Sequence, residues 1–232
     1  MLEPGQGVLS LAVARWHWAF GRGTAVPSLF GAVGVAPRLQ VGASVERDAS
    51  RYADGTRQTS FGDSYIVGKA VLLDGHTRRV GIAVSPLLQV LGNTSLDFYR
   101  YYKSASTDRI QWALPVHVQV RLGSMRVYGS AGHFSVGASF AGVSFDAPVG
   151  SRLVAIGTVS QAYSTDSGTL ADELSLSPRR TDASGGAWII ISTSVYPFCV
   201  IGRTISSTDL NSMTLSANVG IAVFLGRRNS RP

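Results

Sequence analysis

An all-β fold is predicted for this chain of 232 residues by three properties of its sequence. Apolar residues alternate with small or polar ones at a period of two along the whole chain, and no comparable helical periodicity appears. Charged residues make up 15% of the chain, well below the roughly 25% usual in soluble domains. Short and long connections also alternate between the patterned stretches. Together these properties predict a closed antiparallel barrel of about twelve strands.

The clearest strand is expected at 213–225. Leu215, Val219 and Leu225 share one face of it, whereas Ser216 and Asn218 lie on the other, because successive side chains of a strand point to opposite faces. The same alternation and the turn residues between stretches place the other strands. The expected strands are 7–18, 26–34, 38–47, 62–73, 79–91, 109–121, 125–134, 138–146, 152–164, 185–195, 199–206 and 213–225.

The connections favour a barrel that crosses a membrane. Short turns are expected at 34–37, 74–77, 123–124, 146–150 and 196–198, and longer polar connections at 47–61, 91–108, 165–184 and 206–212. One short link, near 135–137, breaks this order. Bacterial outer-membrane barrels have short periplasmic turns and longer external loops. Strands of about ten residues cross a bilayer when tilted, and lipid forbids an open sheet edge, so the sheet must close.

The alternative to a membrane barrel is a soluble β-sandwich or jelly roll with the same alternation. The barrel is favoured because lysine occurs only at Lys69 and Lys103, whereas a soluble sandwich wets its surface with more lysine and glutamate. We expect a single domain over 1–232, with the barrel at about 7–225 and a short polar tail at 226–232. Cys199 is the one cysteine, which excludes an intrachain disulfide and a cysteine metal site.

The residues 34–42, the pair Gly62-Asp63 followed by Lys69, the triplet at 202–204 and the closing strand at 216–224 resemble a known family. It is the family of bacterial outer-membrane transporters associated with phenol-degradation pathways, and the resemblance spans about 28–225. It implies a porin-like barrel that passes or binds small, often apolar or aromatic, solutes. The chain departs from the pattern in its tail after Phe224 and in having no visible signal peptide.

If the apolar faces point outward, the opposite faces line a lumen. Charges of both signs there form a polar ladder that sets pore selectivity, or they satisfy one another in a narrow barrel. Glu46 is expected near a rim. The surplus of arginine and lysine favours anionic or polarisable solutes. The candidate lumen residues are Asp63, Lys69, Gln111, His117, Gln119, Arg121 and Arg203.

An aromatic and basic cluster is expected in the long loop at 91–108. It consists of Tyr99, Arg100, Tyr101, Tyr102 and Lys103. The cluster holds a ligand at the mouth, or contacts lipopolysaccharide phosphates through Arg100 and Lys103, or belongs to an aromatic girdle at the membrane interface. Further expected girdle residues are Trp16, Trp18, Trp112, Trp188 and Tyr196.

An enzymatic alternative rests on His133 and Ser135, which resemble the His-x-Ser of outer-membrane lipid A deacylases. In that hypothesis His133 is the general base, Ser135 the nucleophile and Asp146 the third group. The match is two residues long, so we expect no catalytic residues and no enzyme. The four histidines lack metal spacing, and no cofactor is implied. Nucleic acid is excluded as a partner because the arginines are not clustered on one element.

The sequence therefore predicts passive transport or binding of a small apolar, aromatic or anionic solute by a barrel in a Gram-negative outer membrane. The expected partners are the lipid bilayer, lipopolysaccharide and the solute. The oligomeric state is left open.

Overall fold

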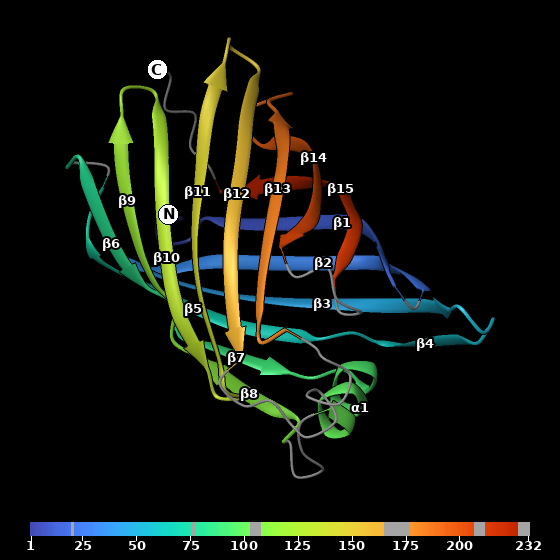
Figure 1. Cartoon of the computed structure of the whole chain (residues 1–232). Coiled ribbons are helices and arrows are strands. Elements are labelled where there is room, and N and C mark those ends of the chain that lie inside the picture. The colour runs from blue at the N-terminus through green and yellow to red at the C-terminus, as the bar shows by residue number, and fades with distance from the viewer. Residues whose placement is uncertain (20, 76–77, 103–107, 165–176, 207–211, 227–232) are drawn as a thin grey trace.

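The computed structural model describes residues 1–19, 21–75, 78–102, 108–164, 177–206 and 212–226. They form one sheet of fifteen hydrogen-bonded segments, and the last segment pairs with the first (Figure 1). The segments are β1 (Gly7–Trp18), β2 (Gly21–Ala36), β3 (Leu39–Tyr52), β4 (Arg57–Phe61), β5 (Ser64–Leu73), β6 (Val80–Val84), β7 (Leu87–Val90), β8 (Ile110–Ala113), β9 (Val116–Leu122), β10 (Met125–Phe134), β11 (Ala138–Val149), β12 (Leu153–Ser164), β13 (Arg179–Ile189), β14 (Val195–Ser206) and β15 (Met213–Leu225), with the helix α1 (Asn93–Tyr102) between β7 and β8.

Six of the segments are halves of three interrupted strands. Both β4 and β5 pair with β3, both β6 and β7 pair with β5, and both β8 and β9 pair with β10. Counting each interrupted strand once leaves twelve strands, and every pairing is antiparallel. The predicted closed antiparallel barrel of twelve strands is confirmed.

The interruptions themselves were not predicted. Two of them, at Ser85-Pro86 and Leu114-Pro115, fall inside stretches that were expected to be continuous at 79–91 and 109–121. The third, at Gly62-Asp63, falls at the start of the expected strand 62–73. Proline has no backbone N–H to give to a ladder, so two of the strands break where the alternation itself continues. The two proline breaks are neighbours, and the N–H of Ser85 donates to the carbonyl of Pro115 at 2.8 Å.

Three expected connections were wrong. Most of 47–61 belongs to β3 and β4, with a turn at 53–56. Of the expected connection 165–184, residues 165–176 lie outside the described residues and most of 177–184 belongs to β13. The expected turn at 196–198 lies inside β14, and the chain reverses at 190–194 instead. Pro197 is tolerated there because it faces Ile221 of β15, while the pairing with β13 begins only at Phe198. The short link at 135–137 is a tight turn in which Gly137 has a φ of +77°.

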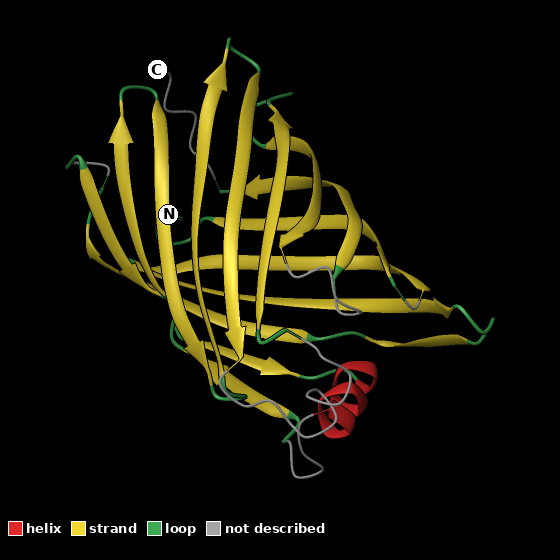
Figure 2. Ribbon diagram, viewed as in Figure 1, coloured by secondary structure: helices red, strands yellow, loops and turns green. Residues whose placement is uncertain are grey.

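The two ends of the barrel differ. At one end, the turn end, short connections follow β2, β5, β9, β11 and β13, and the N-terminal residues lie beside β2. At the other end, the loop end, lie the connections that follow β1, β3, β7, β10, β12 and β14, including α1 (Figure 2). None of the described helices is both long and apolar enough to span a bilayer.

The apolar stripe of the sequence is on the outside of the barrel. Leu11, Val143 and Val219 are 49%, 57% and 55% exposed, although the alternation marks them as the apolar face of their strands. In a sandwich this stripe would be buried between two sheets. The described residues form one closed sheet, so the sandwich alternative is wrong.

Candidate functional site

Six of the seven candidate lumen residues lie on the inner face. On β9, for example, the exposed side chains of Val116 and Val118 lie on either side of His117. The six residues are Asp63, Lys69, Gln111, His117, Gln119 and Arg121.

Arg203 is the exception and corrects the prediction. It is paired with Ala183 and lies between the exposed Ile201 and Ile205, so it is on the outer face. The inner positions of this part of β14 are Gly202 and Thr204, and the Thr204 side chain is 3% exposed. The sequence prediction followed the charge of Arg203, but the strict alternation of the strand decided its direction.

Three carboxylates gather near the Gly62-Asp63 break. Glu46 and Asp48 point inward from β3, and Gly62 lies against both. A Cβ on Gly62 would be 2.5 Å from Asp48 Oδ2 and 2.7 Å from Glu46 Cγ, so any larger residue would displace these two side chains. The Oδ1 atom of Asp48 is buried and has no hydrogen-bond partner among the described residues.

Asp63 ties this break to the loop that carries α1. Its Oδ2 accepts a hydrogen bond from Gln89 Nε2 at 2.7 Å, and its Oδ1 accepts one from the backbone N–H of Gly92 at 2.9 Å. Asn93, the first residue of α1, accepts a hydrogen bond from Arg109 at 3.0 Å through its Oδ1. Ser60 and Thr94 add a contact of 3.2 Å between their hydroxyl oxygens. The start of α1 is therefore fixed to the inner wall at the loop end.

Replacing Asp63 with alanine should loosen this connection. A hydrogen bond to a charged group contributes about 1.5–3 kcal/mol, so losing two of them should raise the population of the opened segment at least tenfold. Limited trypsin digestion of the folded protein should cut after Arg100, within α1, at least ten times faster than in the wild type. Asp54→Ala, in the exposed turn at 53–56, is the control and should leave the rate unchanged. Equal rates for all three proteins would contradict the role given to Asp63.

Basic side chains gather toward the turn end of the same wall. Lys69 is paired with Gln40, and Arg121 is paired with Arg126. Within the described part of the chain, no carboxylate forms an ion pair with Lys69 or Arg121. Arg126 differs, because its Nη2 lies 2.8 Å from Asp146 Oδ2. The polar wall thus carries carboxylates toward the loop end and, toward the turn end, two cations that no described carboxylate pairs with.

The opposite wall is aromatic. The ring centroids of Trp188 on β13 and Phe198 on β14 are 4.9 Å apart, and those of Tyr196 on β14 and Phe224 on β15 are 5.1 Å apart. Gly220 of β15 leaves room for the Phe198 ring, since a Cβ there would be 2.6 Å from its Cζ. Toward the turn end, the lumen is therefore lined by an aromatic wall on one side and a charged wall on the other.

These placements correct most of the expected girdle. Trp188 and Tyr196 are on the inner face; Trp16 also points inward, with its ring over Gly23, and Trp18 contacts Tyr52 edge-on at 6.1 Å. Trp112 is on the outer face and 55% exposed, as a girdle residue would be. The position of a tryptophan in the alternation of its strand decides whether its side chain points inward or outward, so residue type alone did not predict the girdle.

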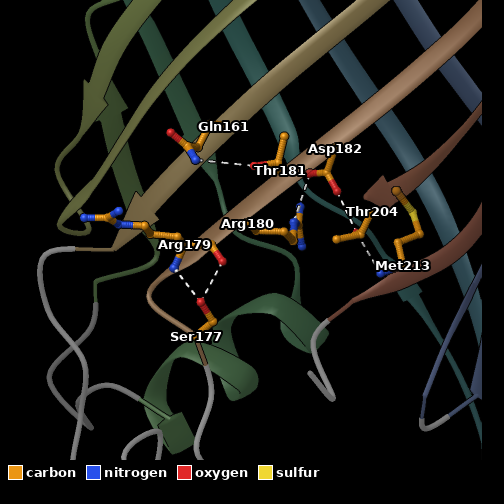
Figure 3. Close-up of polar contacts among 8 residues, drawn as sticks. All are labelled: Gln161, Ser177, Arg179, Arg180, Thr181, Asp182, Thr204 and Met213. Carbon is orange, nitrogen blue, oxygen red and sulfur yellow. Dashed lines mark hydrogen bonds and ion pairs between the residues drawn. The ribbon is translucent and has the colours of Figure 1, made fainter. Parts of the chain in front are cut away.

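A second polar cluster lies at the loop end of β13 and β14, and sequence reasoning did not single it out. Asp182 Oδ2 accepts a hydrogen bond from Arg180 Nε at 2.9 Å, and its Oδ1 accepts one from Thr204 Oγ1 at 2.7 Å (Figure 3). Thr204 Oγ1 in turn accepts the N–H of Met213, which begins β15. The inward positions of Arg180 and Asp182 in the alternation were the signal that could have found them.

The aromatic and basic cluster lies in a helix rather than in an irregular loop. Tyr99, Arg100, Tyr101 and Tyr102 belong to α1, and Arg100 is exposed. Lys103 lies outside the described residues, as do the side chains of the three tyrosines. Contact of this cluster with a ligand, a girdle or lipopolysaccharide stays a prediction.

The groups of the hydrolase alternative do not meet. His133 is on the outer face, where its Nδ1 lies 2.9 Å from Ser139 Oγ. Ser135 Oγ instead donates to Gln111 Oε1 at 2.7 Å and accepts the N–H of Trp112 at 3.0 Å. Asp146 is bonded to Arg126 near the turn end. His133 and Ser135 therefore bind different partners and do not form the proposed base and nucleophile pair.

Comparison with known proteins shows the fold. No protein-family model and no curated protein matches the chain. An outer membrane channel from Pseudomonas putida F1 superposes with a TM-score of 0.67 at 12% identity, over 97% of each chain. The NanC porin does so with a TM-score of 0.64 at 10% identity, over 93% of this chain and 98% of the porin.

Two other solved barrels have the same fold. The KdgM porin, in complex with disordered oligogalacturonate, has a TM-score of 0.59 at 8% identity and covers 92% of this chain and 98% of its own. LpxR from Salmonella typhimurium has a TM-score of 0.57 at 10% identity and covers 93% of this chain and 99% of its own. The chain therefore has the fold of outer-membrane β-barrels, most of those named here being channels.

Proposed function

We propose that this protein is a channel of a Gram-negative outer membrane, through which a small solute passes, or in which it binds, without an energy source. The observation that carries the proposal is the two-sided lumen. Lys69 and Arg121, which form no ion pair with the described residues, lie on one wall, and aromatic rings in tilted and edge-on contact lie on the other. Such a lining suits a solute with both an apolar or aromatic part and a charged part. The turn end would face the periplasm and the loop end the exterior, as in other bacterial barrels.

An aromatic or anionic solute fits this lining best. Rings such as those of Trp188 and Phe198 offer faces for an aromatic group. The cations of Lys69 and Arg121 attract an anionic group on its way to the turn end. The resemblance to transporters associated with phenol-degradation pathways points in the same direction. KdgM, which has the same fold, is a porin in complex with an oligogalacturonate.

A pair of neighbouring cysteines tests whether the lumen conducts. Ser130 points inward across from His117, whereas Ala131 points outward across from Ala141. In a Cys199→Ala background, the purified protein is placed in planar phosphatidylcholine bilayers and treated with a charged methanethiosulfonate. We expect the reagent to reduce the conductance of Ser130→Cys by more than half and to leave that of Ala131→Cys unchanged.

Two outcomes would overturn the proposed function. One is the absence of any conductance or solute flux from the untreated protein. The other is an equal response of the two cysteine variants, because a conducting lumen is reached only from the inner face. A change confined to Ser130→Cys supports conduction along the charged wall.

A further inference from the structure

A row of basic side chains crosses four neighbouring strands on the outer face. His17, Arg22, Arg51 and Arg57 are direct cross-strand neighbours on β1, β2, β3 and β4, near the loop end. The three arginines are exposed. Because neighbouring strands lie about 4.8 Å apart, the row spans about 15 Å.

The adjoining row adds a fourth arginine and two hydroxyl groups. Arg15, Thr24 and Thr59 point outward from β1, β2 and β4, one step closer to the middle of the barrel. Together with Arg22, Arg51 and Arg57 they line a hollow of about 450 Å³ in the outer surface. We call this set of six residues the arginine hollow.

The positive charge of the hollow is not neutralised by the part of the chain that is described. Neither of the two ion pairs found there, Arg126–Asp146 and Arg180–Asp182, involves its arginines. The turn between β3 and β4 carries one carboxylate, that of Asp54, and its Oδ1 accepts the N–H of Thr56 within the same turn at 2.8 Å. Four guanidinium groups that share no carboxylate repel one another unless an anion lies between them.

The hollow lies directly above the aliphatic band of the barrel. The next outward positions toward the turn end are the exposed residues Val13 on β1, Val26 on β2, Arg47 on β3 and Phe61 on β4. Below Arg47 the band continues with Val45, and below Val26 with Leu29. A membrane lipid that lies against this region would contact mainly aliphatic side chains toward the turn end and guanidinium groups toward the loop end. That order of contacts is the order of acyl chains and phosphates in a membrane lipid.

We propose that the arginine hollow binds the phosphates of lipid A, the phosphorylated glycolipid of the outer leaflet, with its acyl chains against the aliphatic band. Guanidinium groups bind phosphate through two parallel hydrogen bonds, and Thr24 and Thr59 add hydroxyl donors. A row of about 15 Å offers sites for more than one phosphate. This inference rests on the proposed outer-membrane location, in which the loop end meets the outer leaflet.

Lipid A binding to the detergent-folded protein tests the proposal. Fluorescent bisphosphorylated lipid A is titrated with the wild type, with the double variant Arg22→Gln/Arg51→Gln and with Arg179→Gln/Arg203→Gln. The last is a matched control, since Arg179 and Arg203 also point outward near the loop end but on β13 and β14. We expect at least tenfold weaker binding for the first pair and less than a twofold change for the control. Removing the phosphates from the lipid should weaken wild-type binding to the same extent.

Several results would overturn the inference. They are equal losses in both double variants, binding that does not depend on the lipid phosphates, and displacement of the probe by millimolar inorganic phosphate or equally well by phosphatidylglycerol. The proposed function is tested separately in phosphatidylcholine, which contains no lipid A. If the wild type conducts but does not bind lipid A, only the proposed lipid A site is wrong. If it binds lipid A but does not conduct, only the proposed channel function is wrong.

Discussion

Replacing Gly186 with alanine is expected to destabilise the barrel severely, while the same change at the adjacent Gly185 is expected to be almost neutral. Gly186 lies on the inner face of β13, across from Val200. A Cβ at this position would collide with the carbonyl oxygen of Cys199 and lie 2.8 Å from the Cα of Val200. Both obstacles are backbone atoms of the neighbouring strand, so no side-chain rotation relieves the overlap.

The expected loss for Gly186→Ala is about 1–3 kcal/mol, the usual result of forcing extra volume into a closely packed site. At Gly185 the nearest atom to a new Cβ is Ile156 O at 3.8 Å, which is an ordinary contact. Alanine also costs less backbone entropy than glycine in a strand, so Gly185→Ala should be neutral or slightly stabilising. Urea unfolding in detergent, followed by tryptophan fluorescence, measures both changes. Similar midpoints for the two variants would contradict the close approach of β13 and β14.

Replacing Lys69 and Arg121, which form no ion pair with the described residues, should shift the ion preference of the lumen from anions toward cations. In Lys69→Gln/Arg121→Gln, the charges left on the polar wall away from the Arg126–Asp146 pair are mainly the carboxylates of Glu46, Asp48 and Asp63. Fixed charges inside a low-dielectric barrel are only partly screened, so they decide which ion enters. We expect the ratio of chloride to potassium permeability to fall at least threefold.

Reversal potentials in a salt gradient measure this ratio. The matched control is Arg47→Gln/Arg203→Gln, which removes the same charge from the outer face. It should leave the ratio unchanged if the ions pass through the lumen. Equal shifts in the two double variants would mean that net charge, and not the inner wall, governs the current.

The strand pattern could be predicted from the sequence because lipid and a polar lumen enforce the same alternation in every strand. That requirement placed Lys69 and His117 on the inner face without any knowledge of their partners. Arg203 was misplaced because its charge was given more weight than its position, although Thr204 beside it occupies the inner position. The sequence contains Pro86 and Pro115, but it does not show whether each proline interrupts its strand. That depends on the backbone hydrogen bonds that the neighbouring strand forms around the proline.

Contacts between strands that are distant in the chain could not be predicted from one sequence. Asp63 was singled out, but its bonds to Gln89 and to the N–H of Gly92 depend on how the loop to α1 returns to the wall. The arginine hollow is another such case. Its residues are scattered over 15–59 and become neighbours only through the register of four strands, so a search for clusters along the sequence passes over them.

The seam between β1 and β15 has a consequence for how the protein is made. Thr214 reaches back to the carbonyl of His17 across 197 positions of sequence, and the whole seam joins the first strand to the last. Because β15 is synthesised after all the other described strands, the seam cannot close earlier. Until then, the backbone amides at both edges of the sheet have no hydrogen-bond partners. The unclosed chain therefore needs a chaperone that covers these edges, because an open sheet aggregates by pairing its edge strands with those of other copies.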